Sequence, residues 1–223
     1  MFGVDSGIIT VAHELKAPLS LLRQLALSLE FEKDIDRVSQ KMIGISERAI
    51  RQVNDLIKIA RLEDGMFEME PVNPRGVCNE IVSELTGLNQ LKIVVDYRNK
   101  DRLVVGNRNL LFSVIYNFCI NALNYGGEDE AYKVFVRNVK GKVQIGVRDF
   151  GPAVPVKVWR EIQNGRVQKP IAMAMRPGSS GLGLYITSKF AEFMGGKLGA
   201  RRHRDGTSFW VELNTSKQMS FLS

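Results

Sequence analysis

The stretch His13-Glu14-Leu15-Lys16-Ala17-Pro18-Leu19 places an ionisable pair and a proline inside a strongly patterned apolar segment. His13 lies beside the apolar stripe rather than within it, so we expect its side chain at the accessible edge of a helix bundle. Pro18 removes a backbone hydrogen bond and predicts a bend one turn later. A surface histidine on a kinked helix fits this pattern equally well. The stripe has the three- and four-residue spacings of a coiled-coil-like helix: Ile8, Ala12, Leu15, Leu19, Leu22, Ala26 and Leu29.

A second helix is predicted after the short polar turn at 30–34. Two helices joined by a short turn form an antiparallel hairpin. This hairpin cannot bury both sides of its apolar stripe alone, so we expect a homodimer in which two hairpins form a four-helix bundle. Gly65 is expected to end the second helix. The apolar face of that helix is made by Val38, Met42, Ile45, Ala49, Leu56 and Ile59.

The periodicity changes after Gly65, which predicts a helical hairpin at 1–65, a second domain at 66–215 and a tail at 216–223. Lys140 and Gly141 indicate a tight β-hairpin. The mixture of elements predicts the α+β class, a two-layer sandwich with helices on one face of a mixed sheet. In the second domain we expect helices at 74–88, at 109–124 and from 181 or 182, and strands at 91–97, 103–105, 132–139, 142–148, 197–202 and 207–213.

Composition limits the classes of function. The chain has 223 residues, 44% of them apolar, enough for one large or two small domains. Its net charge of +7 is scattered, and the basic cluster at 201–204 is typical of a solvated rim, so no nucleic-acid partner is expected. Cys78 and Cys119 lack metal-ligand spacing and indicate small buried residues in a reducing compartment. With no membrane-length apolar run, a cytoplasmic chain is expected.

Two asparagines, Asn117 and Asn121, are four residues apart on a predicted helix and therefore share a face. Buried amides need hydrogen-bond partners. These two could bond the neighbouring backbone, or their carbonyl oxygens could face a hard cation such as Mg²⁺, which prefers oxygen ligands.

Two further clusters carry glycines. Asp149 follows a strand and could accept a hydrogen bond from an exocyclic amine, while Gly151 lets a flat ring approach the backbone. An ordinary glycine-proline turn capped by aspartate is the alternative. The glycine-rich loop at 178–183 leads into a helix, whose unpaired amides attract phosphate. A glycine-rich loop alone is weak evidence for a phosphate-binding site.

Taken together, four motifs resemble the H, N, G1 and G2 boxes of a sensor histidine kinase of a two-component system. They are His-Glu-x-Lys-x-Pro-Leu at 13–19, Asn-x-x-x-Asn-Ala at 117–122, Asp-x-Gly-Pro at 149–152 and Gly-Leu-Gly-Leu at 181–184. The resemblance extends from about residue 5 to residue 214. It implies a Bergerat-type ATP-binding fold for the second domain, with ATP and Mg²⁺ as cofactors.

The resemblance also implies roles for individual residues. His13 would accept the phosphoryl group through a ring nitrogen, while Glu14 draws the proton from the other nitrogen. Asn121 would be the Mg²⁺ ligand, with Asn117 beside it at the phosphates. The remaining cofactor-binding roles would fall to Asp149 at the adenine amine, Gly151 next to it, Tyr125 stacked near the adenine, and Gly181, Leu182 and Gly183 over the phosphates.

Three departures from the family pattern stand out. Asn124 replaces a Lys or Arg, which removes one positive charge near the phosphates. Ala17 replaces the Thr or Asn that orients a water in relatives with phosphatase activity, so weak phosphatase activity is expected. The phenylalanine-rich box of the family is poorly matched, with Trp159 and Ile162 as its nearest equivalents.

The resemblance implies the catalytic portion of a protein-histidine kinase. It would autophosphorylate on His13, pass the phosphoryl group to an aspartate on the receiver domain of a response regulator, and reach a membrane only through a segment absent from this chain. The alternative is a degenerate kinase that acts as a dimeric docking module with poor nucleotide turnover, an interpretation favoured by Asn124. The presence of His13, Glu14, Asn121 and Asp149 favours the active kinase.

Overall fold

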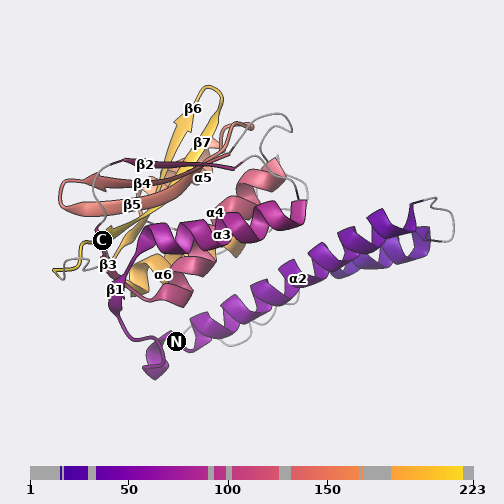
Figure 1. The fold of residues 1–223 in the computed structure, drawn as a ribbon, viewed down its shortest axis with the longest axis horizontal. Coiled ribbons are helices and arrows are strands. Elements are labelled where there is room, and N and C mark those ends of the chain that lie inside the picture. The colour runs from indigo at the N-terminus through magenta and orange to yellow at the C-terminus, as the bar shows by residue number, and fades with distance from the viewer. Residues whose placement is uncertain are drawn as a thin grey trace. The chain divides into compact units, whose positions relative to one another are not determined.

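The computed structural model describes residues 16, 18–29, 34–89, 93–98, 102–125, 132–165, 167 and 182–217. The chain divides into two compact units, Met1–Arg61 and Leu62–Ser223. Figure 1 shows the elements, which are α2 (Ile35–Ala60), β1 (Glu70–Val72), α3 (Pro74–Asn89), β2 (Ile93–Arg98), β3 (Val104–Gly106), α4 (Arg108–Tyr125), β4 (Tyr132–Val139), β5 (Lys142–Arg148), α5 (Val156–Gln163), α6 (Leu182–Phe193), β6 (Lys197–His203) and β7 (Gly206–Asn214).

The first unit is helical at 18–28 and along α2. Asp34 caps α2, because its carboxylate accepts a hydrogen bond from the Arg37 backbone N–H at 3.0 Å. The prediction that this helix ends at Gly65 is wrong. It ends at Ala60, and a short 3₁₀ turn at Leu62–Asp64 precedes Gly65, whose φ of +70° is readily adopted by glycine.

Helix α2 carries a second apolar row in addition to the predicted one. Val38 and Ala49 of the predicted face are buried. Ile43, Ile50 and Ile57 follow one another at seven-residue intervals, and they are 56%, 60% and 49% exposed. A seven-residue repeat of branched apolar residues is the pattern of a helix–helix seam. This isoleucine row therefore leaves the first unit with an apolar face that its own described residues do not cover.

The second unit contains a five-stranded sheet with the order β2-β4-β5-β7-β6. Strands β2 and β4 are parallel, and the other neighbours are antiparallel. Helices α3, α4 and α6 cover one face of this sheet (Figure 1). The structure thus confirms the predicted α+β class with helices on one face of a mixed sheet. Strands β1 and β3 form a separate antiparallel pair.

Along the strands, apolar residues that alternate with other residues form the core. On β5, Val143, Ile145 and Val147 are buried, as the sequence pattern predicts. The predicted turn between β4 and β5 is also confirmed, since Lys140 and Gly141 have φ values of 47° and 81°. The prediction missed β1 and α5, which are only three and eight residues long. Such short segments contain too few residues for a periodicity to be recognised.

The two cysteines belong to the core between the helices and the sheet. Cys78 on α3 and Cys119 on α4 are free and buried, as predicted. Burial raises the pKa of both thiols, that of Cys119 to about 12. Both therefore remain protonated at neutral pH and contribute as small apolar groups.

Candidate functional site

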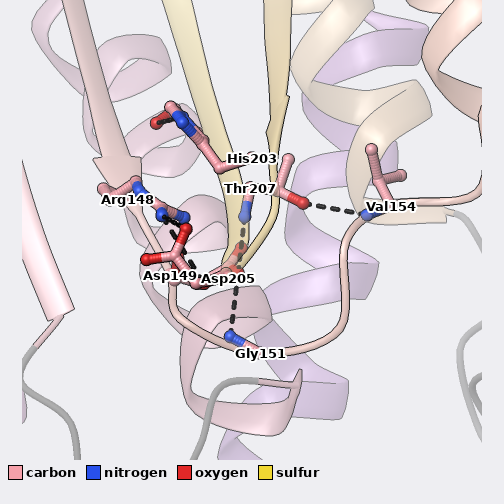
Figure 2. A network of polar contacts seen from close by, with 8 residues as sticks. Arg148, Asp149, Gly151, Val154, His203, Asp205 and Thr207 are labelled. Carbon is pink, nitrogen blue, oxygen red and sulfur yellow. Dashed lines mark hydrogen bonds and ion pairs between the residues drawn. The ribbon is translucent and has the colours of Figure 1, made fainter.

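Asp149 lies immediately after β5, and its side chain is held by the backbone of the neighbouring strand. The residue is only 4% exposed. Its carboxylate oxygen Oδ1 accepts hydrogen bonds from the backbone N–H of Thr207 at 2.9 Å and of Gly151 at 3.3 Å (Figure 2). Its own backbone N–H donates to the Thr207 carbonyl at 2.9 Å. The direction of this carboxylate is therefore set by the sheet and by the first turn of the following loop.

Thr207 and Gly206, at the start of β7, are part of this site and were missed by the sequence analysis. The Thr207 hydroxyl is fully buried and accepts a hydrogen bond from the Val154 N–H at 2.9 Å, which ties the loop after Asp149 to β7 (Figure 2). Gly206 has φ +133°, and a Cβ atom there would lie 2.8 Å from Asp149 Oδ1. The signal available in the sequence was Asp-Gly-Thr, a turn followed by a β-branched strand residue.

Arg148 joins this network through its guanidinium group. Its guanidinium group forms an ion pair with Asp205 at 2.7 Å and also donates to the Asp149 carbonyl (Figure 2). A backbone hydrogen bond holds the pKa of Asp205 below its usual value; burial opposes this shift, and the charge and hydrogen bond of Arg148 add to it. Arg148 thus links the end of β5 to the turn that precedes Gly206.

The two asparagines of α4 meet the glycine of α6. A Cβ atom added at Gly183 would lie 3.8 Å from Asn121 Nδ2 and 3.9 Å from Asn117 Oδ1. The Nδ2 atom of Asn117 is buried and has no hydrogen-bond partner among the described residues. Neighbouring backbone therefore does not satisfy this amide, and the first of the two interpretations left open by the sequence fails for Asn117. A buried donor without a partner is costly and indicates a missing acceptor.

This arrangement fits a nucleotide. A phosphate oxygen would supply the acceptor that Asn117 lacks, and the absence of a side chain at Gly183 leaves room beside both amides. The amide oxygen of Asn121 is a ligand type that suits Mg²⁺. In the described ranges, no group of three or more His, Cys, Asp and Glu side chains could hold a metal ion.

Several predicted site residues lie wholly or partly outside the residues that the structure describes. His13, Glu14 and Gly181, together with Ala17, lie outside the residues that the structure describes. Tyr125 is the last residue of α4, but its side chain and that of Asn124 also lie outside the described part. Leu182 begins α6 and is buried, with 1% exposure.

A family model provides the deciding comparison. The model of the histidine kinase-, DNA gyrase B- and HSP90-like ATPases matches residues 106–217, half of the chain. The chain belongs to this ATPase family. The matched range contains Asn117, Asn121, Asp149, Gly183 and Thr207, the residues that the fold gathers around the two clusters described above.

Within this ATPase family, the proteins similar to this chain include histidine kinases. The hybrid signal transduction histidine kinase K of Dictyostelium discoideum is 25% identical over 227 residues, covering 92% of this chain. The chain spans 19% of that relative's length. The Acinetobacter baumannii histidine kinase AdeS superposes with a TM-score of 0.66 at 17% identity, covering 92% of this chain and 98% of that one. These comparisons confirm the resemblance to a sensor histidine kinase catalytic domain.

A second similar structure is that of the histidine kinase ThkA, solved in complex with the response regulator protein TrrA. It superposes with a TM-score of 0.63 at 22% identity over 93% of this chain and 61% of that one.

Within the described ranges, no helix combines the length and the apolar content that a membrane crossing requires.

Proposed function

We propose that this chain is an ATP-dependent protein-histidine kinase that autophosphorylates on His13 and then transfers the phosphoryl group to an aspartate of a response regulator. The observation that carries the proposal is the buried, unpartnered Nδ2 atom of Asn117, which lies with Asn121 against Gly183. In this proposal, residues 1–65 provide dimerisation and phosphotransfer, residues 66–215 bind ATP, and 216–223 form a tail.

Each part of the nucleotide site has a proposed role. Bound ATP would supply the γ-phosphoryl group, and Mg²⁺ would neutralise phosphate charge. Asn117 would donate its free N–H to a phosphate oxygen, and the Asn121 oxygen would ligate the metal. Gly181, Leu182 and Gly183 would cover the phosphates at the start of α6, where the helix dipole places partial positive charge.

Asp149 would recognise the adenine of ATP. Its carboxylate is held in one orientation by two backbone N–H groups, so it can accept from an exocyclic amine without reorganising. Gly151 would let the flat ring approach the backbone, and Tyr125 would stack near it. Thr207 belongs to the same network and would position Asp149 for this contact.

His13 would be the nucleophile, attacking through a ring nitrogen while Glu14 takes the proton from the other ring nitrogen. Positioning supplies most of the catalysis in phosphoryl transfer. The isoleucine row of α2 supports a homodimer, because Ile43, Ile50 and Ile57 are exposed at the spacing of a helix–helix seam. Two hairpins would then form the four-helix bundle that carries His13.

The proposed partner is the receiver domain of a response regulator, an assignment supported by the similarity to ThkA in its complex with TrrA. Weak phosphatase activity follows from Ala17, which has no polar group to orient a water. A degenerate docking module with poor nucleotide turnover is the second candidate. Asn124 favours it, because it replaces a positive charge expected near the phosphates.

Autophosphorylation with γ-labelled ATP and Mg²⁺ tests the proposal. We expect acid-labile label on the parent chain, none on His13→Gln, and a strong loss on Asn121→Asp, which changes the metal ligand. Asn109→Asp is the matched control on the same helix, because Asn109 is exposed in the first turn of α4. If the parent chain is folded and dimeric but takes up no label, the kinase proposal is wrong and the docking module becomes the favoured function.

A further inference from the structure

A concave surface lies at the edge of the sheet, where α5 packs against β6. It encloses about 470 Å³ and contains none of the residues assigned to ATP. Both tryptophans of the chain contribute to it. We call it the β6-edge pocket, and its lining residues are Trp159, Gln163, Ala200, Arg201, Arg202 and Trp210.

One wall of the β6-edge pocket is held on the edge strand by hydrogen bonds. The Trp159 indole N–H donates to the Ala200 carbonyl at 3.2 Å, and the Gln163 amide donates to the same oxygen at 2.7 Å. This carbonyl points away from β7 and would otherwise be open to an added strand. Because α5 covers it, strand addition is blocked here, and a partner must be recognised by side chains.

The other wall is the indole of Trp210, which lies on the strand backbone. Trp210 is opposite Gly199 on β6 and Gly146 on β5. A Cβ atom at Gly199 would lie 2.5 and 2.6 Å from two atoms of the indole ring. The missing side chain therefore lets one face of the ring pack on β6, while Trp210 remains partly exposed. Both tryptophans are thus pre-positioned and lose little freedom on binding.

Two arginines bring positive charge to this pocket. Arg201 is exposed, and Arg202 is anchored through its Nε atom, which donates to the Val154 carbonyl at 2.8 Å. Among the described residues, no carboxylate lies within ion-pair distance of either arginine, whereas Lys197 on the same strand pairs with Glu212 at 3.3 Å. Guanidinium groups match carboxylates in bidentate geometry. Tryptophan and arginine are also the residue types that dominate binding energy at protein interfaces.

We propose that the β6-edge pocket docks an acidic segment of a protein partner, with one apolar side chain in the pocket and carboxylates on Arg201 and Arg202. Charge complementarity identifies the occupant as acidic. An anionic membrane fits less well, because both indoles are held against the sheet instead of projecting from it. A nucleic acid fits less well, because a phosphate track needs a row of available basic side chains, whereas Lys142 and Lys197 beside the pocket are already paired with Glu212.

The full chain can be titrated with a library of acidic peptides that lack tryptophan and vary two central apolar positions between glutamates. Emission of the two tryptophans reports binding directly. We expect a subset of peptides to shift this emission in a saturable and salt-sensitive way. Arg201→Glu should weaken binding by about tenfold or more, because it reverses one charge of the contact. Trp210→Phe should weaken binding while keeping the fold.

Lys41→Glu is the matched control, since it makes the same charge change at an exposed residue of the first unit and should leave peptide affinity unchanged. ATP affinity of Arg201→Glu should also remain unchanged, which separates this proposal from the kinase proposal. The docking proposal is overturned if no peptide binds, or if Arg201→Glu and Lys41→Glu bind alike. It is also overturned if vesicles of phosphatidylserine and phosphatidylcholine, or a DNA duplex, bind at Arg201 and peptides do not.

Discussion

Asp149 and Thr207 are 58 residues apart in the chain and exchange two hydrogen bonds. The Thr207 N–H donates to the Asp149 carboxylate, and the Asp149 N–H donates to the Thr207 carbonyl, both at 2.9 Å. This pair extends the ladder between β5 and β7 by one step beyond Arg148 and Ser208. A side chain held in this way can present a carboxylate in one fixed direction.

The first prediction concerns Asp149→Asn. The amide oxygen can still accept from Thr207, so the free energy of unfolding should fall by only about 1 kcal/mol. Affinity for ATP should fall about tenfold or more, because the carboxylate acceptor for the adenine amine is lost. Calorimetric titration with ATP measures the effect. Asp205→Asn is the control, since Asp205 is exposed and pairs with Arg148; equal losses in both variants would contradict the assignment.

The second prediction compares two glycines. In Gly206→Ala, the new Cβ would overlap Asp149, so the free energy of unfolding should fall by about 2–4 kcal/mol. In Gly141→Ala, φ is also positive but nothing lies within 4 Å, and a loss of about 1 kcal/mol is expected. Urea unfolding followed by tryptophan emission gives both values. Similar losses would mean that backbone strain, and not contact with Asp149, explains Gly206.

The third prediction separates binding from stability on α4. Asn117→Ala removes a buried donor that has no partner, so stability should change by less than about 0.5 kcal/mol while ATP affinity falls. Asn107→Ala removes an oxygen that accepts from the backbone N–H groups of Asn109 and Leu110, and should cost about 1 kcal/mol with ATP affinity retained. Paired thermal unfolding and ATP titration distinguish the variants. A large stability loss in Asn117→Ala would show that its amide is satisfied.

The fourth prediction tests the isoleucine row of α2. Ile50→Lys places a charge in the centre of the proposed seam, so the dimer should dissociate at concentrations where the parent chain remains dimeric. Lys41→Glu alters an exposed residue of the same helix outside this row and should leave the dimer intact. Sedimentation equilibrium measures both. An unchanged dissociation constant for Ile50→Lys would place the dimer interface elsewhere.

The fifth prediction concerns pH. Burial, followed by the charges of Arg148 and Arg201, lowers the pKa of His203, whose Nε2 lies 3.0 Å from Ser208 Oγ. Unfolded histidine titrates near about 6.5, so below that pH the unfolded chain binds the proton more readily than the folded chain. Stability should therefore fall between about pH 7 and pH 5. Urea midpoints should show a smaller fall for His203→Gln; an identical pH profile would exclude this histidine as the cause.

Much of the fold could be predicted from local patterns. The alternation on β5, the turn at Lys140 and Gly141, and the apolar helix that carries Asn117 and Asn121 all follow from residues close in sequence. Helix α5 was missed because it is short, and the end of α2 was misplaced because Gly65 follows a 3₁₀ turn instead of the helix itself.

Local patterns were enough to predict the α+β class, the order of the long elements and the motifs that carry Asn117, Asn121, Asp149 and Gly183, because periodicity and short motifs are local properties. Which of these residues come into contact depends instead on how the strands pair and the helices pack. The strand order β5-β7-β6 brings Thr207 and Gly206 to Asp149, and the packing of α6 on α4 brings Gly183 to the two asparagines. These contacts depend on pairing between distant segments, which no local spacing encodes.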